Sequence, residues 1–182
     1  MMLKLRKTEP SQPLVVSMTA VRTGDRLLIV GCGELKVIEQ IAGKPGISGR
    51  ACAVDATDER TARALAAAER EGALLEVETA PVTSLPFSAE SFDVAVVNHL
   101  LPELREDQRA AALSEIARVL RGGGRCIVIQ GGRRGGLAGL FGGAPLMRSD
   151  EVESLMQSAG LRAVRTLAER QGLIFVEGGR RT

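Results

Sequence analysis

Aromatic side chains are scarce in this chain of 182 residues, which has no tryptophan, no tyrosine and only four phenylalanines. Sites for single-stranded nucleic acid stack bases on aromatic rings, and sites for quaternary ammonium groups enclose them in aromatic cages. The chain has too few aromatic residues to favour either kind of site. Its charge is also nearly balanced, with 24 basic and 22 acidic residues, so we expect no nucleic-acid partner.

Cysteine and histidine are scarce as well, with three cysteines and a single histidine, His99. Cys32, Cys52 and Cys126 lack the close pairing of a zinc site, and we interpret them as reduced core thiols of a cytoplasmic protein. No apolar run reaches the length of a membrane span, and the run 14–18 is too short for a secretion signal. We therefore expect no metal site and no integral membrane contact.

The chain does contain a regular alternation of short apolar runs and amphipathic segments. The apolar runs predict strands, and the amphipathic segments predict helices. Gly43, Gly72 and Gly122 end the first three helices. The expected strands are 27–30, 50–54, 74–79, 92–98, 125–130, 161–168 and 173–177, and the expected helices are 34–42, 58–71, 105–120 and 149–159, the last capped by Ser149.

Strands that alternate with helices favour a parallel α/β sheet. The last two expected strands have only a short turn around Gln171 and Gly172 between them, so they predict an antiparallel ending to that sheet. We assign 21–182 to one domain and 1–20 to a short N-terminal extension.

The first expected strand ends at the turn Gly31-Cys32-Gly33, and a helix follows at once. Glycine lets the backbone bend sharply and approach a ligand closely, and the start of a helix presents free N–H groups. A tight strand-to-helix connection without any ligand would use the same glycines. The turn alone therefore leaves cofactor binding and a purely structural role open.

Four segments carry a more specific pattern: LLIVGCG at 27–33, AVDAT at 53–57, LPFSAESFDVAVVNHLLPEL at 85–104 and EIARVLRGGGRCIVI at 115–129. In this order they resemble class I S-adenosylmethionine-dependent methyltransferases, in the small-molecule branch related to ubiquinone and menaquinone biosynthesis. The resemblance implies a doubly wound, Rossmann-like sheet of seven strands in the order 3-2-1-4-5-7-6, with strand 7 antiparallel.

The resemblance also implies S-adenosylmethionine as the cofactor, bound at the carboxyl ends of the first, second and fourth strands. Asp55 ends the second strand, where a carboxylate can accept hydrogen bonds from both ribose hydroxyls. The other residues expected to border the cofactor are Gly31, Cys32, Gly33, Ala56, Thr83 and Asn98.

A dinucleotide-binding enzyme would use the same turn and the same acid. Lys36, however, stands at the third glycine position of the dinucleotide fingerprint, where a long side chain would crowd the pyrophosphate. The later segments also have no counterpart in hydride-transfer enzymes. We therefore favour methyl transfer over hydride transfer.

His99 follows Asn98 at the end of the fourth strand, where the resemblance places the methionine part of the cofactor and the substrate. Methyl transfer depends strongly on alignment and on exclusion of water, and it needs a base only when the acceptor loses a proton. His99 is the candidate catalytic base. Alternatively, it is a hydrogen-bonded residue at the rim of the sheet with no chemical role.

Three departures from the family pattern keep a second function open. Ile29 and Pro81 stand where the family usually has acids, and Leu35 stands at its third glycine. The first hypothesis is an enzyme that methylates a small, apolar or aromatic acceptor. The second is a methyltransferase-like binding module that has lost activity and acts through a protein partner.

The acceptor pocket of the first hypothesis lies between Asn98, His99 and the segment 130–147, which occupies the family's substrate-loop position and has seven glycines. That segment is either a simple connector or a gate over the site. Arg133 and Arg134, beside apolar side chains of the same segment, also suit a contact with an anionic membrane surface or a protein.

Overall fold

The computed structural model describes residues 13–131 and 147–182. Its strands are β1 (Arg26–Val30), β2 (Arg50–Asp55), β3 (Glu76–Thr79), β4 (Phe92–Asn98), β5 (Leu120–Gly131), β6 (Arg162–Arg170) and β7 (Leu173–Gly179). Its helices are α1 (Leu14–Thr19), α2 (Leu35–Ile41), α3 (Asp58–Arg70), η1 (Leu101–Glu103), α4 (Glu106–Val119) and α5 (Ser149–Ser158). The expected strands and helices are all present, and α1 and η1 are additional.

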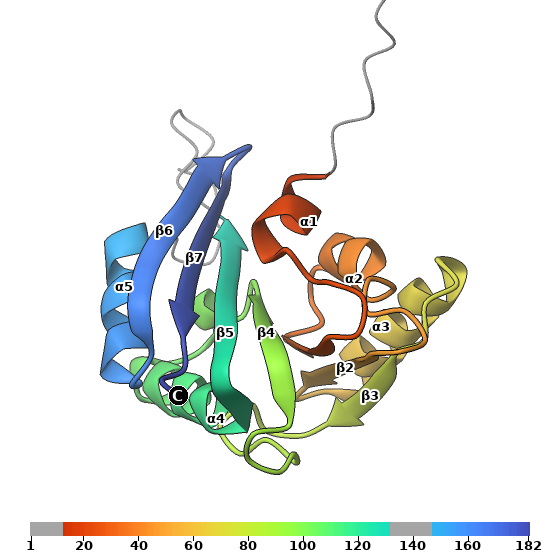
Figure 1. The fold of residues 1–182 in the computed structure, drawn as a ribbon, viewed down its shortest axis with the longest axis horizontal. Helices are drawn as coiled ribbons and strands as arrows, with labels where there is room; N and C mark the ends of the chain where they lie inside the picture. Colours follow the sequence, from red (N-terminus) through yellow and green to blue (C-terminus); the bar gives the residue numbers. More distant parts are fainter. Residues whose placement is uncertain (1–12, 132–146) are drawn as a thin grey trace, which may run out of the picture.

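All seven strands form one sheet in the order β3-β2-β1-β4-β5-β7-β6 (Figure 1). Neighbours from β3 to β5 are parallel, and β7 is antiparallel to both β5 and β6. The hairpin between β6 and β7 turns at Gln171 and Gly172, whose φ angles are both positive, as in the type I′ turns that match the twist of the strands. The predicted sheet order and its antiparallel strand are confirmed.

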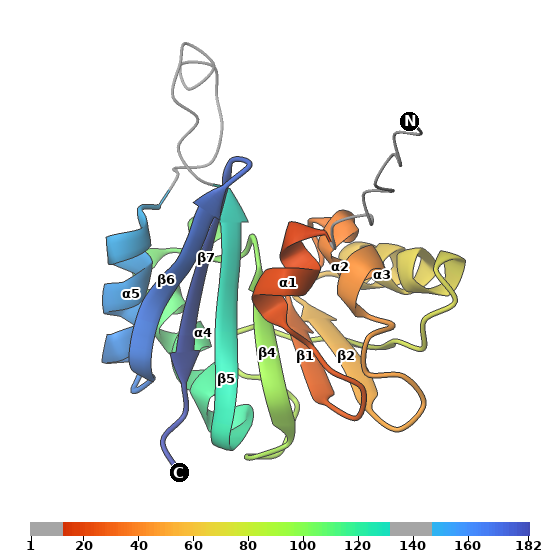
Figure 2. The same cartoon turned by 45° about the horizontal axis from the view of Figure 1, so that its top comes forward.

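Helices cover the sheet on both faces (Figures 1 and 2). Along β1, Leu28 and Val30 enter a core cluster shared with α4 and α5, whereas Leu27 and Ile29 enter a second cluster shared with α1, α2 and α3. A strand buried on both faces needs apolar residues at every position. The runs of consecutive apolar residues in the sequence follow from this arrangement.

The helix α1 was not expected from the sequence. Val15 and Val16 are buried in the same cluster as the apolar residues of α2, and the Thr19 hydroxyl donates to the Val15 carbonyl at 2.8 Å. The helix stops at Ala20, which has a left-handed φ of 44°. Six residues are too few for a helical period to stand out in the sequence, so this helix depends on its packing.

The start of β5 and the N-cap of α5 both differ from the expectation. The strand β5 begins at Leu120, directly after α4, because Leu120 pairs with Phe92 and an irregularity in the register accommodates the glycines that follow. Arg148, not Ser149, is the N-cap residue of α5. The Glu151 carboxylate accepts the Arg148 N–H at 3.2 Å, so the helix already includes Ser149 as its first residue.

The parallel strands bring the expected site residues to one edge of the sheet. Gly31 follows β1, Asp55 ends β2 and Asn98 ends β4. The tip of the β6–β7 hairpin lies at this same end of the sheet (Figure 2). In open α/β sheets this edge is where ligands bind.

At the opposite end of the sheet, Asp93 links the starts of β1 and β4. Its carboxylate accepts the Arg26 backbone N–H at 2.8 Å and the Arg26 guanidinium at 3.1 and 3.2 Å, and it also pairs with Arg121. Burial alone would raise the pKa of Asp93, but these hydrogen bonds outweigh it and hold that pKa well below its usual range.

We expect Asp93→Asn to lower the free energy of unfolding by about 1–2 kcal/mol at pH 7, because charge-assisted hydrogen bonds are lost. Since the native pKa lies below the unfolded value of about 3.9, the stabilisation is present above that value and is lost as the pH falls toward the native pKa. Urea unfolding at pH 7 and at pH 3 measures the free energy of unfolding of both proteins. The original chain and Asp93→Asn should differ less at pH 3 than at pH 7. Asp107→Asn, in an exposed pair with Arg105, is the control and should leave the midpoint unchanged.

Candidate functional site

The glycine turn is enclosed by the ends of β2 and β4. The Gly31 N–H donates to the Val54 carbonyl at 2.9 Å, and Gly31 has a φ of +96°. A Cβ at this position would lie 2.7 Å from the Asn98 carbonyl oxygen and 3.1 Å from the Leu100 Cβ. Both the backbone angle and the lack of space therefore require glycine here.

Asp55 connects this turn to β2. Its side chain is almost completely buried, and its Oδ2 accepts the Cys32 N–H at 2.8 Å. Arg60 Nη1 lies 3.7 Å from the same oxygen. In the described part of the chain, no group donates a hydrogen bond to Asp55 Oδ1, which remains available as an acceptor.

The thiol of Cys32 does not contribute chemistry to this turn. Burial, with a further contribution from the negative charge of Asp55, raises the pKa of Cys32 to about 12, so the thiol stays protonated. Cys52 and Cys126 are free and buried too, as expected for core thiols. Cys32 therefore acts at the site through its backbone N–H.

Asn98 joins the end of β4 to the turn. Its Nδ2 donates to the carbonyls of Gly31 and Glu34, each at 3.0 Å, and its side chain is buried. Glu34 is the N-cap residue of α2, and its carboxylate accepts the Lys36 N–H at 3.2 Å. One amide thus holds both sides of the turn and the start of α2.

The Asn98 amide also sets the proton position on His99. Both amide hydrogens are used, so Asn98 Oδ1, which lies 3.1 Å from His99 Nδ1, must be the acceptor in that contact. The neutral ring therefore carries its proton on Nδ1, and Nε2 keeps a free lone pair. His99 has a φ of +54°, an uncommon backbone conformation outside glycine, and its N–H donates to the Ile129 carbonyl at 2.8 Å.

The charge state of His99 follows from its surroundings. Burial lowers the pKa of His99, and the carboxylates of Glu34 and Glu103, which act in the opposite direction, do not compensate. The ring is therefore neutral at pH 7. A neutral imidazole with a free Nε2 can take up a proton.

The remaining expected site residues lie around this group. Gly33 and Ala56 are exposed, and Thr83 is half-buried in a turn that follows β3. The Ala80 N–H donates to the Asp55 carbonyl at 3.0 Å, which links the start of that loop to β2. The structure thus brings Gly31, Cys32, Asp55, Asn98 and His99 into one hydrogen-bonded group, whereas no hydrogen bond connects Thr83 to them.

A pocket of about 360 Å³ lies beside His99. It is bounded by α1, by the first turns of α2 and by the tip of the β6–β7 hairpin. Its lining residues are Pro13, Leu14, Val15, Glu34, Lys36, Val37, Gln40, His99, Gln171 and Leu173. Gln40 and the α1 residues could not be predicted as part of a site, because only the fold brings these separate segments together.

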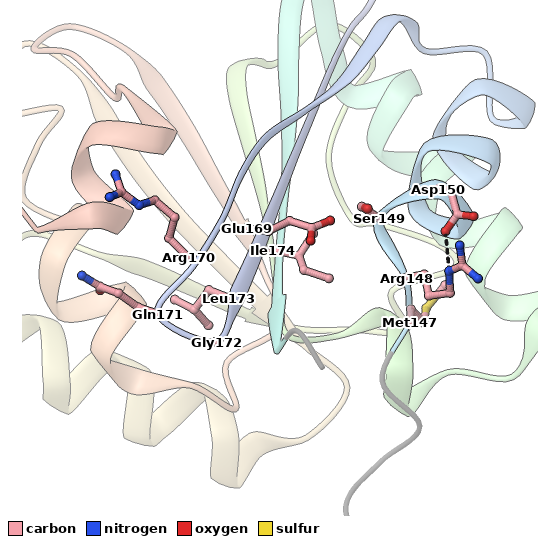
Figure 3. A pocket seen from close by; sticks show the side chains of 10 residues that line it. All are labelled: Met147, Arg148, Ser149, Asp150, Glu169, Arg170, Gln171, Gly172, Leu173 and Ile174. Atoms are coloured by element: carbon pink, nitrogen blue, oxygen red, sulfur yellow. Dashed lines mark hydrogen bonds and ion pairs between the residues drawn. The ribbon is translucent and has the colours of Figure 1, made fainter. Parts of the chain in front are cut away.

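A larger pocket of about 500 Å³ lies on the other side of the same hairpin, against the start of α5 (Figure 3). Met147 and Ile174 line it, and the buried Gln130 donates to the Met147 carbonyl at 3.3 Å. Neither His99 nor the glycine turn lines this pocket. Of the predicted segment 130–147, residues 132–146, including Arg133 and Arg134, lie outside the described residues.

Residues 13–131 and 147–182 lack two features that would point to other chemistry. Within these ranges, no three His, Cys, Asp or Glu side chains come together as a metal site requires. Of the helices that they contain, none has both the length and the apolar character needed to cross a membrane.

Comparison with known proteins gives a family match and several relatives. Residues 28–128 match the family model described as "Methyltransferase domain". The O-methyltransferase resE of Aspergillus sclerotiorum is 31% identical over 150 residues, which are 78% of this chain and 56% of that protein. The uncharacterized protein Rv1403c of Mycobacterium tuberculosis is 36% identical over 118 residues, 64% of this chain and 40% of that protein. The chain thus spans about half the length of the curated relatives that it matches.

Solved structures share the fold. A SAM dependent methyltransferase from Aquifex aeolicus has a TM-score of 0.77 at 21% identity, over 91% of this chain and 87% of that one. The S-adenosylmethionine-dependent methyltransferase SibL, in its apo form, has a TM-score of 0.74 at 20% identity, over 94% of this chain and 55% of that one. At these identities the likeness shows the fold alone.

The packing around the turn predicts a large cost for Gly31→Ala. Gly72 also has a positive φ, +69°, but apart from its chain neighbours no described residue has an atom within 4 Å of an added Cβ there, so Gly72→Ala is a matched control for backbone strain. We expect Gly72→Ala to cost about 1 kcal/mol and Gly31→Ala at least about twice as much, because the Asn98 carbonyl must also move. Thermal or urea unfolding measures both, and equal costs would contradict the close approach at Gly31.

Proposed function

The chain belongs to the methyltransferase domain family, and we propose that it transfers a methyl group from S-adenosylmethionine to a hydroxyl group of a small, apolar or aromatic acceptor. The observation that carries this proposal is the hydrogen-bonded group that links the Asp55 carboxylate, through the glycine turn and Asn98, to His99. Membership of the branch related to ubiquinone and menaquinone biosynthesis stays a prediction. The name of the Aspergillus relative, an O-methyltransferase, is consistent with a hydroxyl acceptor.

The residues present fit the cofactor. Asp55 Oδ1 is an open acceptor for a ribose hydroxyl, and Ala56 beside it is exposed and too small to obstruct an adenosine. The two family acid positions are taken by Ile29, fully buried in β1, and Pro81, exposed after β3, and neither residue type has a carboxylate. Recognition of the nucleoside by a charged group therefore rests on Asp55.

S-adenosylmethionine, when bound, supplies an electrophilic methyl group on a sulfonium. His99 Nε2 accepts the proton of the acceptor's hydroxyl group. Loss of this proton makes the hydroxyl oxygen a better nucleophile. Asn98 Oδ1 holds the ring by its Nδ1–H throughout. The carboxylates of Glu34 and Glu103, whose charges favour the protonated ring, stabilise the imidazolium once the proton has been taken.

The pocket beside His99 supports the choice of acceptor. At about 360 Å³ it has the size of a small-molecule site, and Leu14, Val15 and Leu173 supply apolar walls. Gln40 lines the same pocket, and its buried Oε1 has no hydrogen-bond partner among residues 13–131 and 147–182. A buried polar atom of this kind favours a ligand that carries a hydrogen-bond donor as well as apolar surface.

We expect Asp55→Asn to weaken S-adenosylmethionine binding by about tenfold or more, because the ribose loses charge-assisted hydrogen bonds. Calorimetric titration measures the dissociation constant, and Asp58→Asn, at the exposed start of α3, should leave it unchanged. Equal affinity in Asp55→Asn and the original chain would exclude the proposed ribose contact. Absence of any binding by the folded original chain would overturn methyl transfer and favour the binding module.

The methylation rate should rise with pH as His99 loses its proton and should then level off. Because burial lowers the pKa of His99 below its ordinary value of about 6.5, the plateau should be reached by pH 7. His99 is the sole histidine, so nitrogen NMR of its ring measures that pKa and the Nδ1–H tautomer directly.

His99→Asn should slow formation of S-adenosylhomocysteine from a panel of small phenols by about 100-fold or more, without changing cofactor affinity. If His99→Asn methylates a phenol as fast as the original chain does, His99 is not the catalytic base.

A further inference from the structure

Arg60, near the start of α3, extends its guanidinium toward the candidate cofactor site. Its Nη1 lies 2.6 Å from Glu103 Oε2 and 3.7 Å from Asp55 Oδ2. The two carboxylates belong to separate elements, since Asp55 ends β2 and Glu103 ends η1, beyond β4. The guanidinium therefore connects the two sides of the glycine turn.

The ion pair between Arg60 and Glu103 lies directly over the second glycine of the turn. A Cβ at Gly33 would meet Arg60 Nη1 and Glu103 Oε1 first, both at 3.8 Å. The same guanidinium stands beside the Asp55 carboxylate. It thus lies between Gly33 and Asp55 Oδ2, in space that a ribose would share if both of its hydroxyls bound that carboxylate.

We propose that the Arg60–Glu103 pair is a latch over the nucleoside site and that Arg60 is a residue that determines cofactor affinity. Asp55 Oδ1 is open to one ribose hydroxyl, but a second hydroxyl reaches Oδ2 freely only after the guanidinium has moved off that oxygen, so full engagement of the ribose competes with the latch. This inference rests on the proposed cofactor site and adds a residue that the family pattern does not supply.

The exposure of the two side chains limits how strongly the latch can act. The side chain of Arg60 is 37% exposed and that of Glu103 is 41% exposed, so water and salt screen their attraction. Pairs of this kind contribute little to stability, and the latch should open readily. We therefore expect it to reduce affinity by a small factor, about two- to fivefold, and not to block binding.

The test uses S-adenosylhomocysteine as the probe, because its ammonium and carboxylate charges cancel and a changed protein charge has little direct effect on it. Arg60→Met should bind this probe about two- to fivefold more tightly than the original chain. Arg70→Met is the matched control, since it removes the same charge from the same helix and breaks an exposed pair with Glu39. The control should leave the dissociation constant unchanged.

Salt gives a second measurement on the same proteins. Raising potassium chloride from about 50 mM to about 500 mM should weaken the latch, so the original chain should bind the probe more tightly while Arg60→Met changes little. Equal or weaker binding by Arg60→Met, or the same salt response in both proteins, would overturn the latch. If neither protein binds the probe although both are folded, the cofactor site itself fails, and the latch fails with it.

Discussion

The geometry of the candidate site depends on one buried amide. Asn98 uses both of its amide hydrogens on the carbonyls of Gly31 and Glu34, and this fixes which way its oxygen points. That oxygen then sets the tautomer of His99. The Asn98 backbone carbonyl also occupies the space beside Gly31. As a result, a single unit contains the glycine turn, the start of α2 and the imidazole of His99, and none of these parts can move without the others.

Much of the fold could be predicted from the sequence, for a physical reason. The run Phe92–Asn98 is buried on both faces of the sheet, so nearly every position is apolar and the strand is visible without any knowledge of its neighbours. The antiparallel ending was visible because no helix fits between Arg170 and Leu173. The order of the strands, in contrast, came from the resemblance of four segments to a family, since periodicity alone does not say which strands are neighbours.

The site could be predicted only in part, because its residues act through contacts between distant segments. Gly31, Asp55 and Asn98 stand at strand ends, and the topology alone brings these to one edge. The tautomer of His99 depends on which carbonyls take the two hydrogens of Asn98, and the reach of Arg60 depends on where η1 places Glu103. Neither contact corresponds to a recognisable spacing of residues in the sequence. The helix α1 is also too short to show a helical periodicity of apolar residues.

The antiparallel strand β7 has a further effect on how the molecule is assembled. Strand β6 carries the chain to the edge where α1 places Leu14, and the reversal into β7 leaves Gln171 and Leu173 there, so one wall of the pocket comes from the beginning of the described chain and another from near its end. Contacts between residues so far apart in sequence require the closure of a very long loop during folding. The pocket beside His99 is therefore complete only once the last hairpin has docked, and a nascent chain that already has its glycine turn and β4 still lacks it.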